Sequence, residues 1–150
     1  MPTPFESAQL NLKLFELRRE PVLREARAWV TRDFNPESFE EMMTELQGQH
    51  NTWFRMVYGY WDMAASLVTM GAIDPEAFRA AHSEIIAAFA KIHPFLEEIR
   101  QSIGEPLIFQ HMETVVMASP DAEATMERRR TRLRSMAKAR KENAAGPASN

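Results

Sequence analysis

The chain of 150 residues contains no cysteine. It therefore has no disulfide, no thiolate ligand for zinc and no cysteine nucleophile. The absence fits a reducing compartment, although exported proteins can also lack cysteine. Charged residues such as Glu6 and Lys13 interrupt any apolar stretch near the start, so no signal peptide is predicted. We therefore expect a cytoplasmic protein.

Glycine is also scarce and scattered. The five glycines lie at positions 48, 59, 71, 104 and 146. None opens a G-x-G-x-x-G or P-loop, and no G-x-S-x-G is present. The sequence thus predicts no catalytic activity and no cofactor.

Long apolar runs are missing as well. The most apolar segment, residues 53–73, contains Arg55 and Asp62, which a membrane-spanning helix would avoid. We therefore predict that the chain does not span a membrane.

The four histidines are His50, His82, His93 and His111. None belongs to a Glu-x-x-His or His-x-x-x-His pair, so we predict no metal site. His82 lies within an apolar helical stripe. It is either a hydrogen-bonded core residue, which is the commoner role, or a group that binds a ligand or senses protons.

Three short phrases predict helix starts. They are Asn35-Pro36-Glu37, Asp74-Pro75-Glu76 and Ser119-Pro120-Asp121. Each combines a side chain that can cap free N–H groups, a proline suited to the first helical position and an acid near the positive end of the helix dipole. Because a long helical pattern follows each phrase, we predict an all-α protein.

The apolar spacing predicts how the helices are arranged. Helices are expected over residues 5–19, 21–33 and from Pro36, with a bend at residues 48–51 and a central helix up to Gly71. A stripe from Phe78 to Ile103 alternates spacings of four and three and continues through Pro94. It predicts one kinked helix over residues 75–103. The short link from Gly71 to Pro75 then predicts a long antiparallel hairpin at the centre of a helical bundle.

The junction between the two arms of this hairpin resembles that of a bacterial family of small helical proteins of unknown function. The resemblance is carried by Tyr60-Trp61-Asp62 and by Gly71-Ala72-Ile73-Asp74-Pro75-Glu76-Ala77-Phe78, and it covers roughly residues 50–103. It implies an α-helical fold and no catalytic role.

One face of the central helix is polar. Arg55, Gly59, Asp62, Ser66 and Thr69 follow one another at spacings of four, three, four and three, so they share one side of the helix. Gly59 leaves a notch between Arg55 and Asp62. The face is either a small polar pocket for a ligand, with His82 as a further candidate, or a solvent side on which Gly59 permits close helix packing.

The C-terminal segment is strongly basic. Residues 127–142 carry eight Lys or Arg and two Glu, a balance of +6, whereas the rest of the chain has a balance of −9. The cations are Arg128, Arg129, Arg130, Arg132, Arg134, Lys138, Arg140 and Lys141. We predict a bundle domain over residues 1–126 and, over residues 127–150, a basic helical arm whose last residues, 143–150, form a frayed tail. The arm is a solvated face, a partner for the acidic body, or a site for an anionic partner such as nucleic acid.

The leading functional prediction is a non-catalytic helical interaction or structural protein. Ten methionines, three tryptophans and long apolar stripes provide much helix surface, so we expect a homo-oligomer, most simply a two-fold dimer. One alternative is a nucleic-acid-binding module that uses the arm. A second alternative is a small-ligand sensor that uses the Arg55–Asp62 face or His82.

Overall fold

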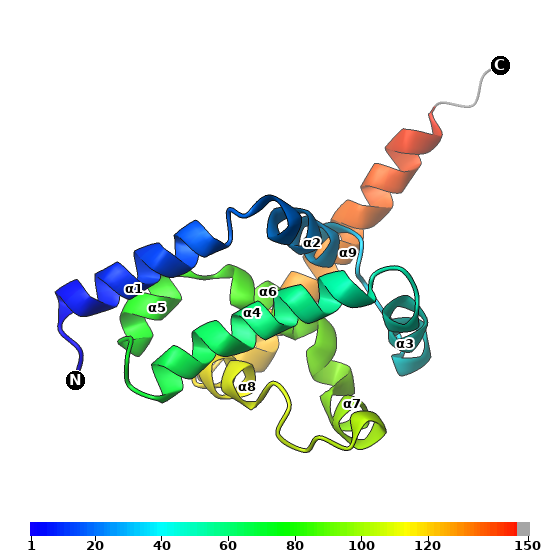
Figure 1. Cartoon of the computed structure of the whole chain (residues 1–150). Coiled ribbons are helices and arrows are strands. Elements are labelled where there is room, and N and C mark those ends of the chain that lie inside the picture. Colours follow the sequence, from blue (N-terminus) through cyan, green and yellow to red (C-terminus); the bar gives the residue numbers. More distant parts are fainter. Residues whose placement is uncertain (147–150) are drawn as a thin grey trace.

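The computed structural model describes residues 1–146, and helices account for most of them (Figure 1). In chain order they are α1 (Pro4–Leu17), α2 (Pro21–Arg32), α3 (Phe39–Gln47), α4 (Asn51–Thr69), α5 (Pro75–Ala81), α6 (Glu84–Ile92), the 3₁₀ turn η1 (His93–Phe95), α7 (Leu96–Ile103), α8 (Gln110–Met117) and α9 (Ala122–Ala145). The predicted all-α class is therefore confirmed. The frayed tail predicted from residue 143 onward is helical up to Ala145, and residues 147–150 lie outside the described part of the chain.

Helix α4 crosses the middle of the molecule and carries much of its core (Figure 1). It packs mainly against α2 and α8. Tyr58, Trp61 and Ala64 are completely buried on it, as expected for a helix with apolar residues on most sides. The central helix predicted from the sequence is thus confirmed.

The single kinked helix predicted over residues 75–103 is wrong. The chain leaves the helical conformation at His82, whose φ of −131° and ψ of 59° end α5. It changes again at η1, where Pro94 has no N–H to donate to a helical hydrogen bond. The apolar stripe continues across both breaks because each helix buries its own apolar residues. The spacing of these residues therefore does not reveal where the helix is interrupted.

The break at His82 also changes which helices pair. Helix α5 packs on α1, whereas α6 packs mainly on α9. Because α4 has its main contacts with α2 and α8, the central antiparallel hairpin is not confirmed. The hydroxyl of Tyr58 still links α4 to α6 by donating a 2.7 Å hydrogen bond to the carbonyl of Ala88.

The three predicted capping phrases have different outcomes. Asp74 caps α5 by accepting a 2.9 Å bond from the N–H of Ala77. At α3 the cap is Ser38, which accepts from the N–H of Glu41, so the phrase around Asn35 does not start that helix. Helix α9 begins after Asp121, whose side chain makes no capping bond within residues 1–146. The missed signal at α3 is the local Ser-x-x-Glu pattern of a capping box.

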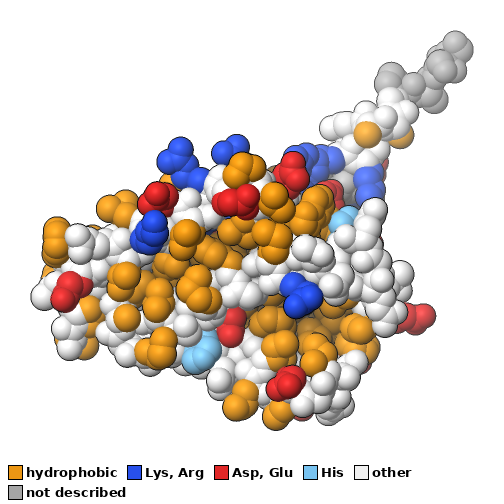
Figure 2. Space-filling view, in the orientation of Figure 1, with side chains coloured by type: hydrophobic (Ala, Val, Ile, Leu, Met, Phe, Trp, Pro, Cys, Tyr) orange, Lys and Arg blue, Asp and Glu red, His pale blue; other side chains and the backbone are white. Residues whose placement is uncertain are grey.

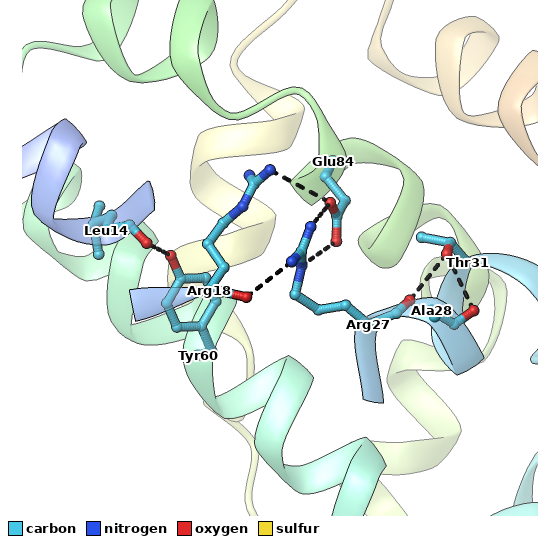
Figure 3. A network of polar contacts seen from close by, with 7 residues as sticks. All are labelled: Leu14, Arg18, Arg27, Ala28, Thr31, Tyr60 and Glu84. Atoms are coloured by element: carbon cyan, nitrogen blue, oxygen red, sulfur yellow. Dashed lines mark hydrogen bonds and ion pairs between the residues drawn. The ribbon is translucent and has the colours of Figure 1, made fainter. Parts of the chain in front are cut away.

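A polar network joins the α1–α2 corner to the start of α6 (Figure 3). The Arg27 guanidinium donates to both carboxylate oxygens of Glu84 at 2.9 and 2.6 Å, and it also donates to the carbonyl of Arg18 at 3.0 Å. The hydroxyl of Tyr60 donates to the carbonyl of Leu14 at 2.5 Å. Bidentate charged pairs of this kind are stronger than neutral hydrogen bonds, so the network fixes α1 and α2 against the bundle.

A second polar anchor is the buried side chain of Lys91, which is only 3% exposed. Its ammonium nitrogen lies 2.5 Å from the carbonyl of Val30, 3.0 Å from that of Thr31 and 3.1 Å from the Asn35 side-chain oxygen. It thereby satisfies carbonyls at the C-terminal end of α2, which have no partner within the helix. Burial lowers the pKa of Lys91 to about 7.

We expect Lys91 to make the free energy of unfolding rise between about pH 7 and pH 9. The folded-state pKa of about 7 lies below the ordinary value of 10.5, so the unfolded chain binds more protons in this range. Stability should therefore increase with pH, by at most about 1.4 kcal/mol per pH unit. Urea unfolding at several pH values measures the slope.

The control is Lys91→Met, which removes the titrating group. The variant should be less stable at every pH, because it leaves two carbonyls without a donor. Its slope should nevertheless be smaller than that of the wild type. Equal slopes would show that other groups titrate on unfolding in this range.

Candidate functional site

The polar face of α4 opens onto a cavity of about 790 Å³. Its polar lining groups come from Gln47, Asn51, Arg55, Asp62, Ser66, Ser102 and His111. Gly59 also lines the cavity, and a Cβ atom built on it would meet no atom within 4 Å. Gly59 therefore leaves open space and does not serve close packing between helices.

The rest of the cavity wall is apolar and comes from several helices. Met43 and Leu46 lie on α3, Phe54 and Met63 on α4, and Ile99 and Ile103 on α7. Figure 2 shows hydrophobic side chains gathered in the hollow between α4, α3 and α7. A mainly apolar wall with a few polar groups is typical of sites that bind small molecules.

Asp62 holds the N-terminus of α8 against α4. Its Oδ1 atom accepts hydrogen bonds from the N–H groups of His111 at 3.1 Å and Met112 at 3.0 Å. The residue before this helix, Phe109, has a φ of 60°, a left-handed conformation that is rare for a bulky side chain. Phe109 has no capping side chain, so a carboxylate from another helix takes that role.

A residue two turns further along α4 strengthens this attachment. The hydroxyl oxygen of Thr69 lies 2.7 Å from Nδ1 of His111. On the opposite side of the cavity, the Arg100 guanidinium on α7 donates to the carbonyl of Ile108 at 3.1 and 3.2 Å. The end of the connection that leads into α8 is therefore fixed from both α4 and α7, and Ile108 and Phe109 line the cavity there.

Arg55 differs from Asp62, Ser66 and His111, whose side chains are hydrogen-bonded within the protein. Its side chain is exposed and makes no hydrogen bond or ion pair with residues 1–146. A guanidinium has five N–H donors, all of which are available here to an additional molecule.

The structure does not bring His82 together with Arg55, Gly59 and Asp62, so grouping it with this notch is corrected. His82 is 1% exposed, and its Nε2 lies 3.1 Å from the side-chain oxygen of Asn11. It borders a separate space of about 20 Å³ beside Val115. Burial lowers the pKa of His82 to about 4, which keeps the ring neutral near neutral pH. His82 is thus a hydrogen-bonded residue of the core.

Residues along much of the basic helix α9 contact the body. Met126 is completely buried. The Arg130 guanidinium donates to the carbonyl of Ala90 at 2.7 Å, and that of Arg140 donates to the carbonyl of Arg32 at 2.7 Å. Both carbonyls lie near the C-terminal ends of helices, where cations are favourable. Arg134 reaches the carbonyl of Pro36 at 3.5 Å.

The other cations of α9 face outward, and the end of the helix extends away from the body (Figure 1). Arg128 donates a 2.9 Å hydrogen bond to the hydroxyl of Thr125. Its ion pair with Asp121 is long at 3.9 Å, as is that of Lys138 with Glu142 at 4.0 Å. No ion pair or hydrogen bond joins Arg129, Arg132 or Lys141 to the part of the chain that the structure describes.

Residues 1–146 contain no group of three or more His, Asp or Glu side chains arranged to hold a metal ion. In the same residues no helix is both long enough and apolar enough to cross a bilayer.

These features define a small all-α protein with a ligand-sized cavity beside its central helix. Residues 4–119 match the family described as Domain of unknown function (DUF4760), and the chain belongs to this family. The predicted resemblance to an uncharacterised helical family is thus confirmed. No curated protein and no solved structure matches the chain. The match ends before α9, so the basic helix lies outside the family region.

Replacing the Asp62 carboxylate tests whether it secures α8. We expect Asp62→Ala to lower the free energy of unfolding by about 1–2 kcal/mol, because two N–H groups lose their acceptor. Urea unfolding measures the loss.

The matched control is Asp121→Ala, which removes an acid that precedes α9 without capping it. That variant should change stability by less than about 0.5 kcal/mol. Equal losses in the two variants would contradict the role of Asp62.

Proposed function

We propose that this chain is a non-catalytic binding protein that holds a small, largely apolar molecule in the cavity beside α4. The observation that carries the proposal is the cavity itself, about 790 Å³ with an apolar wall and a few polar groups. Known small-molecule sites have volumes of roughly 300–1,000 Å³. Met43 and Met63 add flexible side chains that can adapt to the shape of a ligand.

The polar face of α4 also fits this proposal better than it fits a purely solvated surface. Asp62 is occupied by α8, whereas Gly59 and Arg55 are left free toward the cavity. A glycine inside a helix costs about 1 kcal/mol relative to alanine. An interior glycine that serves no close helix contact is consistent with a need for space beside it.

Filling the space beside Gly59 provides the test. We expect Gly59→Leu to abolish binding of N-phenyl-1-naphthylamine, a neutral apolar dye that fluoresces in dry sites. The added side chain enters open space, and leucine favours helix more than glycine does, so the melting temperature should not fall. Dye titration and thermal unfolding measure the two effects.

The control variant is Gly59→Ala, which adds one methyl group. It should raise stability by about 0.5–1 kcal/mol and should keep most of the dye binding. Dye binding that is the same in the wild type and in Gly59→Leu would place the dye elsewhere and contradict the proposed function.

A second candidate function, self-association, is favoured by the orientation of α1. Phe5 and Leu12 are 70% exposed and Phe15 is 48% exposed, although they share one stripe of this helix. Its buried side instead contains the polar residues Ser7 and Asn11. Exposed apolar stripes of this kind are typical of surfaces that bind another protein.

A second copy of the chain is the partner that we propose for this stripe. Positions 5, 8, 12 and 15 are symmetric about residue 10, as an antiparallel pair of identical helices requires. Such a pair places each Leu12 opposite the small Ala8 of the other copy and each Phe5 opposite Phe15. The helix also carries both Glu and Lys, so two copies do not meet with a strong like charge.

A charge placed in the stripe should separate the copies. We expect the wild type to scatter light as a dimer at micromolar concentration, and Leu12→Glu to scatter as a monomer with an unchanged fold. Leu107→Glu, at an apolar residue that is exposed on a different segment, should remain a dimer. If the wild-type protein scatters light as a monomer, self-association through α1 is contradicted.

The nucleic-acid alternative has less support than either of these. Arg130, Arg134 and Arg140 already bind backbone carbonyls of the body. The helix also has no aromatic residue to stack on bases.

A further inference from the structure

Arg55 is the one Lys or Arg side chain among the described residues that line the cavity. Several partly buried arginines elsewhere in the protein are paired with other residues. Arg27 pairs with Glu84, and Arg100 binds Ile108 and Glu113. Arg55 has no such partner, although it stands beside a mainly apolar wall. An unpaired cation at this position points to an anionic group on the ligand.

The charges along α4 determine how a ligand is oriented in the cavity. Arg55 and Asp62 are seven residues apart, which is about 10 Å along the helix. An anionic head is attracted to the Arg55 end of the cavity and repelled from the Asp62 end. The two ends are separated by the open space at Gly59, which leaves room for an apolar body.

The other polar side chains of the cavity also restrict which chemical group can form the anionic head of the ligand. Asn51 and Gln47 also line the cavity, and their amide groups can donate hydrogen bonds to an oxygen anion. No second Lys or Arg of the described chain lines this cavity to balance a second negative charge. A planar guanidinium matches a carboxylate through two parallel hydrogen bonds.

We propose that the ligand of this cavity is a monocarboxylate with an apolar body, and that Arg55 binds its carboxylate. The inference rests on the proposed function, because it names the class of molecule that the same cavity takes. The carboxylate lies at Arg55, and the apolar body lies along Gly59 against the side chains of Phe54 and Ile99.

The test compares ligands that share one apolar body and differ in the head. Decanoate, 1-decanol and decyl phosphate each compete with N-phenyl-1-naphthylamine for the full-length protein. We expect decanoate to displace the dye at a concentration about ten times lower than decanol, because a charged hydrogen-bonded pair contributes on this scale. Decyl phosphate should be weaker than decanoate, because its second charge has no partner.

Arg55→Met should bring decanoate and decanol to equal potency in displacing the dye. The side chain is exposed and unpaired, so the variant should melt like the wild type. The matched control is Arg128→Met, which removes an exposed arginine of α9 and should keep the preference for decanoate.

The outcomes separate the two proposals. If the dye binds in a manner that depends on Gly59 but decanoate and decanol are equally potent in the wild type, the carboxylate inference is wrong and the proposed function stands. If decyl phosphate is the strongest competitor, the ligand is a phosphate and the inference is again wrong. If calorimetry shows no binding of decanoate and the dye does not bind either, both proposals are overturned.

Discussion

The cavity depends on one interaction, the bond from the Asp62 carboxylate to the N-terminus of α8. Phe109 enters this helix in a left-handed conformation and has no side chain that could cap it. Asp62 supplies the missing acceptor from α4 and so fixes where α8 begins. Arg100 holds the preceding carbonyl of Ile108 from α7. The two attachments fix the entry to α8 from both α4 and α7, where Ile108 and Phe109 line the cavity.

Part of this site could be predicted from the sequence and part could not. The regular spacing of Arg55, Gly59, Asp62 and Ser66 predicts one polar face with a notch, and these residues do line one cavity. The opposite wall comes from α3, α7 and the residues before α8, and no local pattern indicates that they meet α4. The left-handed φ of Phe109 also has no signal in the sequence, because glycine is the residue that usually marks it.

The fold shows the same division between local and tertiary information. Helical spacing and capping residues predict an all-α chain because they act within a few residues. The stripe from Phe78 to Ile103 could not reveal the break at His82, because α5 and α6 bury their apolar sides against different helices. In α1 hydrophobicity alone does not mark the buried side, since Ser7 and Asn11 face the body beside Leu14 whereas Phe5 and Leu12 face solvent. The buried polar residues are explained by their partners, Asp74 and His82.

The central claim is that the space beside α4 is a binding site, and methyl NMR with decanoate tests it most directly. We expect the largest chemical-shift changes at the methyl groups of Met43, Met63 and Ile99, which line the cavity. The methyl groups of Met126 and Ile85 are buried away from it and should change little. Changes confined to exposed methyl groups such as that of Met136, or no saturable change at all, would contradict the account.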